Sequence, residues 1–161
     1  MNIMEIQNVQ YAYDGKKKVL KGINAQMERG KMYAILGPSE CGKTTLLSLP
    51  GGLDSPSSGQ ILYQGEDIAK TGLANHRHSH VAFIFQSYNL IDYLTPMENV
   101  ALTSKLPPLP ILEQLGLTAE EAKRNVLLLL SEGQQQRVAI ARALASDAQV
   151  TRWPHSINRL W

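Results

Sequence analysis

The sequence contains little cysteine, little net charge and no long apolar run. Cys41 is the single cysteine among 161 residues, which excludes an internal disulfide and favours a reducing compartment. No segment approaches the roughly 20 apolar residues that a membrane helix needs, and Met1–Gln7 lacks the pattern of a signal peptide. The formal net charge of +2 gives no argument for a nucleic-acid partner. We therefore expect a cytoplasmic chain whose membrane partner, if it has one, is another polypeptide.

Apolar residues make up 43% of the chain and charged residues 19%, as in an ordinary globular domain with a core. Alternating or short apolar runs predict strands, which we place at Ile3–Val9, Val19–Met27, Met32–Leu36, Gln60–Gln64 and Val81–Phe85. The run Met32–Leu36 is apolar throughout, which is typical of a strand buried on both faces. Strands that alternate with helical segments predict an α/β fold.

Residues 97–146 have a helical pattern that predicts a small helical subdomain. The prolines of Leu106–Pro110 interrupt this pattern, because proline cannot continue a helix. Thr118 and Ser131 each begin a capping-box pattern, with Glu or Gln three residues later. We expect these two boxes to open helices that run to about residues 129 and 146.

A glycine-rich segment follows Met32–Leu36 and precedes a predicted helix at Lys43–Leu49. It reads Gly37-Pro38-Ser39-Glu40-Cys41-Gly42-Lys43-Thr44 and matches the phosphate-loop pattern G-x-x-x-x-G-K-[ST]. Glycines let backbone N–H groups turn toward phosphate oxygens, and the N-terminus of the helix adds its dipole. We predict that Lys43 reaches the β- and γ-phosphates and that the Thr44 hydroxyl binds Mg²⁺. The alternative is a glycine-rich turn without a ligand.

Three residues near this loop are unusual for a nucleotide site. Glu40 costs about 1–2 kcal/mol if its backbone is left-handed, and its carboxylate lies near the expected polyphosphate, so we expect weakened rather than abolished affinity. Cys41 is interpreted as a small residue that fills the loop, with redox sensing as the alternative. Pro50 costs about 3 kcal/mol if its position is helical and little if the helix has already ended.

A second motif begins beyond the proline cluster and continues into a predicted helix. It reads Leu130-Ser131-Glu132-Gly133-Gln134-Gln135-Gln136-Arg137. Before it in the chain stand Phe83-Ile84-Phe85-Gln86, Asn89-Leu90-Ile91 and Glu98-Asn99-Val100. With the phosphate loop, these segments resemble, in order, the motifs of the ATP-binding subunit of ATP-binding-cassette (ABC) transporters. The resemblance spans about residues 3–148, is strongest to the lipoprotein-release and macrolide-export branch, and implies a P-loop NTPase core with a helical subdomain.

The resemblance implies roles for individual residues. It implies that ATP with Mg²⁺ is held by Gly37–Thr44, Thr45 and Gln86, and that Thr44 and Gln86 bind the metal. It also implies that Tyr13 stacks on the adenine. Ser131, Glu132, Gly133 and Gln134 would then face ATP held by a second subunit in a head-to-tail dimer. The Q-loop region around Gln86 would contact a transmembrane permease subunit, which places the chain on the inner face of a cell membrane as a peripheral subunit.

Two features depart from the family pattern. Glu132 replaces a signature glycine, and its charge opposes approach to a γ-phosphate by about a few kcal/mol. In the family a strand ending in Asp-Glu follows the signature helix, whereas Thr151–Trp161 contains no acidic residue, and His155 does not match the family's later histidine. We interpret residues 1–150 as a partial nucleotide-binding domain truncated before these acids, and residues 151–161 as an atypical tail foreign to the fold. We therefore identify no catalytic residue and expect nucleotide binding with very slow hydrolysis.

Two other functions stay open at this point. One is a soluble ABC ATPase of DNA repair or translation, which a long coiled-coil insertion or zinc-type cysteine pairs would favour; the sequence contains neither. The other is a non-catalytic nucleotide-binding fragment, such as an inhibitory partner or a pseudogene product. His76, His78 and His80 alternate, which predicts a solvated strand entrance, with a metal site as the alternative.

Overall fold

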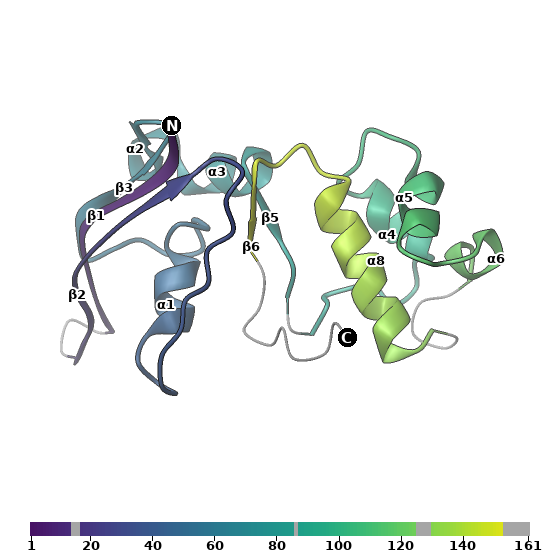
Figure 1. Ribbon diagram of the computed structural model, residues 1–161, viewed down its shortest axis with the longest axis horizontal. Helices are drawn as coiled ribbons and strands as arrows, with labels where there is room; N and C mark the ends of the chain where they lie inside the picture. Colours follow the sequence, from purple (N-terminus) through teal and green to yellow (C-terminus); the bar gives the residue numbers. More distant parts are fainter. Residues whose placement is uncertain (14–16, 86, 125–129, 153–161) are drawn as a thin grey trace. The chain divides into compact units, whose positions relative to one another are not determined.

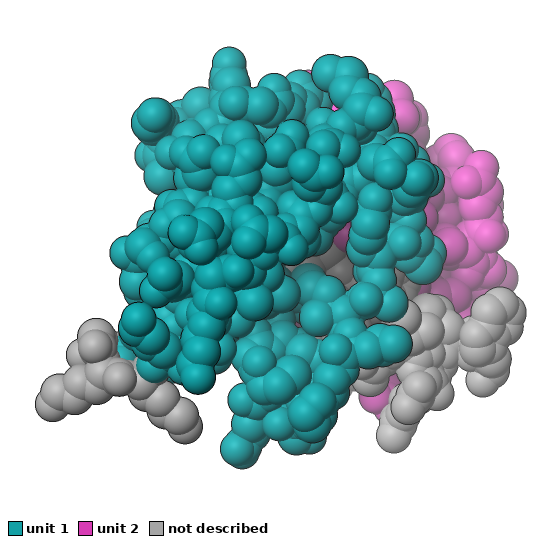
Figure 2. Space-filling view, turned by 60° about the vertical axis from the view of Figure 1, so that its left-hand side comes forward, with its two compact units in different colours: residues 1–78 teal, residues 79–161 magenta. Residues whose placement is uncertain are grey.

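The computed structural model describes residues 1–13, 17–85, 87–124 and 130–152. The chain forms two compact units, Met1–His78 and Ser79–Trp161, which Figure 2 shows in teal and magenta. The glycine-rich loop belongs to the first unit, and the second motif belongs to the second unit.

The first unit is built on an antiparallel sheet, drawn in Figure 1. Its strands are β1 (Asn2–Tyr13), β2 (Lys17–Glu28), β3 (Ser58–Tyr63) and β4 (Glu66–Asp67), in the order β2-β1-β3-β4. Met4 and Ile6 of β1 are buried and two positions apart, which is the period of a half-buried strand. The strands predicted at Ile3–Val9, Val19–Met27 and Gln60–Gln64 are confirmed, with different end residues.

A bulge in β1 brings its backbone close to β3. Asn8 has a φ of 48°, and its N–H donates to Asn24 Oδ1 at 2.8 Å. A Cβ added to Gly59 would lie 2.4 Å from Asn8 O, and Gly59 itself has a φ of 84°. This approach of two backbones therefore requires glycine at position 59.

Three short helices accompany the sheet: the first lies between β2 and β3 in the chain, and the other two follow β4. They are α1 (Lys43–Ser48), α2 (Ile68–Thr71) and α3 (Leu73–Ser79). The helix predicted at Lys43–Leu49 is thus confirmed as α1. Pro50 is buried just beyond the end of α1, so it removes no hydrogen bond from the helix interior.

The solvated strand entrance predicted at His76, His78 and His80 is wrong. His76 lies on α3 and is 1% exposed, with its Nε2 3.0 Å from Pro50 O. Its ring packs edge-on against Tyr63, with 5.2 Å between the ring centroids. The carbonyl and the aromatic ring give this imidazole a polar and an apolar partner in the core. Neither partner is near in sequence, so the alternation of histidines gave no sign of them.

The buried strand predicted at Met32–Leu36 does not form. This segment has no regular secondary structure, and Met32 and Leu36 are 94% and 89% exposed. A strand that is apolar on both faces is stable only when neighbouring strands pair with it. Among the strands of the described ranges, none pairs with these residues. The prediction fails because the described part of the chain gives the segment no partner strand, although its composition suits one.

The second unit combines a two-stranded parallel sheet with four described helices. Strand β5 (Val81–Phe83) pairs with β6 (Val150–Arg152). The helices are α4 (Pro96–Ala101), α5 (Pro108–Gln114), α6 (Ala119–Ala122) and α8 (Glu132–Leu144). Val100, Leu112 and Val138, from α4, α5 and α8, are fully buried in one apolar cluster. This cluster fixes α8 against the other helices.

The proline cluster interrupts the helical pattern as predicted, since α4 ends at Ala101. The prediction did not include that a new helix, α5, begins inside the cluster, at Pro108. Proline is tolerated there because the N–H groups of a first turn have no acceptor within the helix.

Two end points in the second unit differ from prediction. Helix α6 ends at Ala122, because the N–H groups of Lys123 and Arg124 donate to carbonyls three residues back and close the helix in a tight turn. Residues 125–129 lie outside the described part.

The sequence places Thr151 and Arg152 in a foreign tail, yet in the structure both residues pair with β5. Strand pairing uses backbone groups, so it does not need the apolar side chains that the prediction required.

Candidate functional site

The glycine-rich segment is an exposed loop that ends at the N-terminus of α1. Gly42 is the N-cap of α1 with a φ of 93°, and it has no side-chain oxygen to cap the first turn. A Cβ added to Gly37 would lie 2.8 Å from Cys41 Sγ, and one on Gly42 would lie 2.9 Å from Val19 Cγ1. The positive φ of Gly42 and its contact with Val19 require glycine at the end of the loop, whereas a side chain at Gly37 would displace the Cys41 thiol. A glycine-rich loop of this kind can turn its amide N–H groups toward an anion.

Lys43 folds back over the loop that precedes it. Its Nζ donates to Gly37 O at 2.8 Å, to Pro38 O, and to Cys41 Sγ at 3.7 Å. These bonds hold the ammonium over the loop backbone instead of extending it into solvent. A positive charge is thus fixed at the place where the sequence predicts phosphate oxygens.

Tyr13 and Thr45 link the end of β1 to α1. Thr45 is 8% exposed, and its Oγ1 lies 3.1 Å from the Tyr13 hydroxyl, whereas Thr44 is exposed. The Tyr13 ring is 54% exposed and packs edge-on against Tyr11, with 5.1 Å between the centroids. The Tyr11 hydroxyl bonds Asp54, a contact that sequence analysis missed because no motif marks it. The predicted adenine-stacking tyrosine is therefore held beside α1 with about half of its surface open.

Glu40 has a φ of 62°, which confirms the left-handed backbone considered for it. This conformation costs a residue with a Cβ about 1–2 kcal/mol. The side chain is exposed, as are Pro38, Ser39 and Cys41 of the same loop. The loop therefore presents one lysine ammonium and one carboxylate, of which the carboxylate is free to turn into solvent.

The second motif forms the N-terminus of α8, where Ser131 is the N-cap. The Gln134 N–H donates to Ser131 Oγ at 3.3 Å, and the Ser131 N–H donates to Gln134 Oε1 at 2.8 Å, which confirms the predicted capping box. The other predicted box is also present, at Thr118 and Glu121. Ser131, Glu132 and Gly133 are exposed. An exposed start of a 13-residue helix is a place where an anion is favoured.

The loop after β5 is bound to α8 by two residues that sequence analysis missed. Arg142 donates to Tyr88 O and to Asn89 O, each at 2.8 Å, and the Tyr88 hydroxyl donates to Glu132 Oε1 at 3.3 Å. Tyr88 and Asn89 have φ values of 60° and 45°, so Arg142 holds a turn of unfavourable backbone. Burial lowers the pKa of Arg142, which nevertheless keeps its charge at neutral pH.

Two residues are predicted to bind magnesium, Thr44 and Gln86. Gln86 lies outside the described residues, so Thr44 is the member of the predicted pair that the structure places. In the ranges that the structure describes, no three His, Cys, Asp or Glu side chains are grouped to hold a metal ion. The alternative metal site at the three alternating histidines therefore has no support. An exposed hydroxyl beside a phosphate-binding loop suits Mg²⁺, which takes most of its ligands from phosphates and water.

Comparison with known proteins identifies the family. The model of the ABC transporter family matches residues 20–153. The chain belongs to the ABC transporter family. The match includes three segments: the glycine-rich loop, hereafter the phosphate loop (residues 37–44), the segment at the end of β5, hereafter the Q-loop segment (residues 83–91), and the start of α8, hereafter the signature segment (residues 130–134).

Individual ABC proteins resemble the chain over most of its length. An uncharacterized ABC transporter ATP-binding protein, YclH of Bacillus subtilis, is 40% identical over 93% of this chain and 71% of its own length. The spermidine/putrescine import ATP-binding protein PotA of Mesoplasma florum is 43% identical, over 92% of this chain and 44% of its own length. The dimeric structure of MJ0796, a bacterial ABC transporter cassette, has a TM-score of 0.79 at 32% identity, covering 93% of this chain and 72% of that chain. The α/β cassette fold expected from the sequence is therefore confirmed.

The described helices of this ABC family member are all too short or too polar to cross a bilayer.

Proposed function

We propose that this ABC family member is an ATP-binding subunit that holds ATP with Mg²⁺ on residues 37–45. The observation that carries the proposal is the Lys43 ammonium bonded over a glycine-bounded loop at the start of α1. Thr44 supplies a metal ligand, and Tyr13 stacks on the adenine. The structural relative MJ0796 supports the choice of ligand, because that cassette is also known in a form bound to ADP and Pi.

The proposal includes two protein partners. A second nucleotide-binding subunit would place its ATP against Ser131–Gln134, where the helix N-terminus and the serine hydroxyl favour a phosphate group. The dimeric structure of MJ0796 supports this arrangement. The other partner is a transmembrane permease, contacted through the Q-loop segment, on the cytoplasmic face of the membrane. Binding and hydrolysis of ATP would drive movement of a solute through that permease.

We further propose that these 161 residues hydrolyse ATP very slowly by themselves. Phosphoryl transfer depends on charge stabilisation and on a group that orients the attacking water. The last acidic residue of the sequence is Asp147, and its carboxylate forms an ion pair with Lys105 at 2.8 Å. Within these residues, the single acid beyond α8 is therefore an exposed carboxylate paired with Lys105, and this is the feature that motivates the proposal of slow hydrolysis.

Two observations bear on the direction of transport: the sequence motifs favour export, and the name of a relative favours import. The segments around Phe83–Gln86 and Glu98–Val100 resemble the lipoprotein-release and macrolide-export branch and favour export. The relative PotA has an import function in its name, which favours import as the second candidate. Reconstitution with the permease in vesicles, with substrate placed on one side only, distinguishes the two.

The first test is binding of a fluorescent ATP analogue with Mg²⁺, run beside phosphate release on the same sample. Lys43→Ala should weaken binding by about 100-fold, because it removes a charge-assisted contact worth roughly 3 kcal/mol. Lys21→Ala is the matched control, since Lys21 is an exposed lysine of β2 in the same unit. Equal binding by both variants would refute the proposed site. Phosphate release that depends on Lys43 would refute slow hydrolysis and leave the binding site standing.

A further inference from the structure

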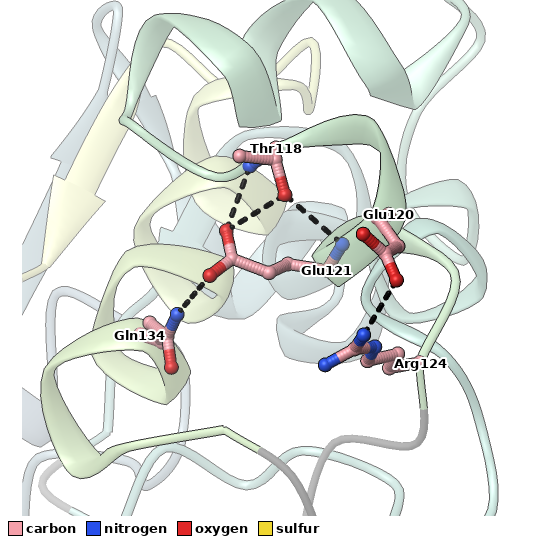
Figure 3. A network of polar contacts seen from close by, with 5 residues as sticks. All are labelled: Thr118, Glu120, Glu121, Arg124 and Gln134. Carbon is pink, nitrogen blue, oxygen red and sulfur yellow. Dashed lines mark hydrogen bonds and ion pairs between the residues drawn. The ribbon is translucent and has the colours of Figure 1, made fainter.

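A chain of hydrogen bonds joins the cap of α6 to the signature segment, as Figure 3 shows. Glu121 Oε2 accepts from the Thr118 N–H at 2.8 Å and from Thr118 Oγ1 at 3.1 Å. Its second oxygen, Oε1, accepts from Gln134 Nε2 at 2.7 Å. Gln134 in turn accepts the Ser131 N–H through Oε1 at 2.8 Å. One carboxylate on α6 is therefore connected, through Gln134, to the N-cap of α8, which lies ten residues farther along the chain.

The donors and acceptors in this chain fit in one arrangement. Glu121 uses both of its oxygens as acceptors, one toward Thr118 and one toward Gln134. The Gln134 amide therefore has to direct its NH₂ toward α6 and its oxygen toward Ser131. If that amide turned over, two oxygens would meet on one side, and the NH₂ would face the Ser131 N–H on the other. The carboxylate thus selects the amide orientation that caps the signature segment.

The charge of Glu121 is compatible with this role. Its hydrogen bonds from the Thr118 backbone and hydroxyl lower the pKa of the carboxyl, so at neutral pH the group is ionised and only accepts. Its neighbour Glu120 points to Arg124 instead and pairs with it at 2.6 Å. The capping box of α4 is built in the same way: the Thr95 N–H donates to Glu98 Oε2 at 2.7 Å, and the Glu98 N–H donates to Thr95 Oγ1 at 3.2 Å.

We propose that Glu121 is a positioning residue for the signature segment, which fixes the Gln134 amide and thereby the Ser131 N-cap that faces a partner's nucleotide. This inference deepens the proposed function and rests on it for the role of the signature segment in the dimer. The connection from Glu121 to Ser131 stands on the geometry alone.

The test uses three variants of the full chain. Glu121→Gln replaces two acceptors by one acceptor and one donor, so it cannot serve both Thr118 and Gln134 in their present orientation. Glu120→Gln is the matched control, because it makes the same chemical change one residue earlier. The double variant E121Q/Q134E exchanges amide and carboxylate. In this variant the Gln side chain at position 121 donates from its NH₂ to the Glu carboxylate at position 134, which reverses the direction of the original bond. The oxygen of the new Gln still accepts from the Thr118 N–H, and the second oxygen of the new Glu still accepts from the Ser131 N–H.

The first readout is the hydrogen-exchange rate of the Ser131 backbone amide, measured by NMR without nucleotide. We expect Glu121→Gln to accelerate exchange about fivefold, the change for one net hydrogen bond, while Glu120→Gln has no effect and the exchange variant restores the original rate. Equal rates in Glu121→Gln and Glu120→Gln would overturn the inference. Failure of E121Q/Q134E to restore protection would overturn it as well, because a merely structural loss is not rescued by the swap.

The second readout is self-association driven by Mg²⁺-ATP, with binding to the phosphate loop measured on the same samples. Glu121→Gln should weaken this association while ATP affinity at the phosphate loop is unchanged. Changed Ser131 exchange with unchanged association would overturn the positioning role in the dimer. If Lys43→Ala bound ATP as tightly as the original chain, the proposed function would be refuted instead. The two failures are therefore distinguishable.

Discussion

Glu40 gives the sharpest prediction about the phosphate loop, because its cost has two separable parts. One part is backbone strain: a φ of 62° in a residue with a Cβ costs about 1–2 kcal/mol. The other part is repulsion between its carboxylate and a bound polyphosphate. The side chain is exposed, so the repulsion acts through a water-like dielectric and amounts to about 1 kcal/mol for one pair of charges at roughly 4 Å.

Two substitutions separate these parts. Glu40→Gln removes the charge and keeps the strained backbone, so Mg²⁺-ATP should bind about fivefold more tightly with no change in stability. Glu40→Gly removes both. It should give the same gain in affinity and raise the free energy of unfolding by up to about 1 kcal/mol, since relief of strain is offset by roughly 0.5–1 kcal/mol of glycine backbone entropy.

Calorimetric titration with Mg²⁺-ATP at two salt concentrations measures the charge effect. The gain in Glu40→Gln should shrink at high salt, because exposed charges are screened over about 10 Å at 0.1 M. Glu66→Gln, an exposed acid on β4 of the same unit, is the control for net charge. A gain in affinity that is equal in both variants, or that does not depend on salt, would refute the local repulsion.

Two further predictions concern stability. Gly59→Ala should destabilise the chain by more than about 3 kcal/mol in urea unfolding, because its Cβ would meet a backbone oxygen at 2.4 Å, whereas Gly65→Ala, with a φ of 87° and open space, should cost only about 1–2 kcal/mol; equal costs would refute the clash. Hydrogen bonds from Thr95 and Thr118 lower the carboxyl pKa of Glu98 and Glu121 below the ordinary 4.5. The ionised carboxylates therefore contribute fully to the free energy of unfolding above pH 4.5, and this contribution is lost as the pH falls through the lowered pKa values. Urea midpoints measured between about pH 6 and about pH 3 should therefore fall less in the double variant E98Q/E121Q than in the original chain, and an equal fall would contradict the assignment.

Local rules were sufficient wherever neighbouring residues determine the structure. The capping boxes at Thr118 and Ser131, the strands β1 and β2, and the loop–helix junction at Gly42 all follow from short patterns whose physics is local. The left-handed backbone of Glu40 was also open to prediction, since the loop geometry prescribes it. These are the elements that define the candidate site.

Contacts between distant residues could not be predicted in the same way. The buried imidazole of His76 is hydrogen-bonded to the Pro50 carbonyl and packs against the Tyr63 ring. Arg142 donates to the Tyr88 carbonyl, which lies more than fifty residues earlier in the chain. Met32–Leu36 shows the converse, because an apolar run predicts a buried strand only if partner strands exist. In each case the deciding partner is set by the tertiary arrangement, about which a periodicity or a motif carries no information.

Glu132 and Glu40 should respond in opposite ways to substitution by glycine. Glu132 lies in the first turn of α8, where an acid is stabilised by about 0.3–1 kcal/mol, and it accepts a bond from the Tyr88 hydroxyl. Glycine there also costs roughly 0.5 kcal/mol in helix propensity. Glu132→Gly should therefore lower the free energy of unfolding by about 1 kcal/mol, whereas Glu40→Gly raises it. Thermal and urea unfolding of the two variants measures both signs. A gain in stability from Glu132→Gly would mean that the acid is strained at position 132 as well, and that its contact with Tyr88 does not stabilise α8.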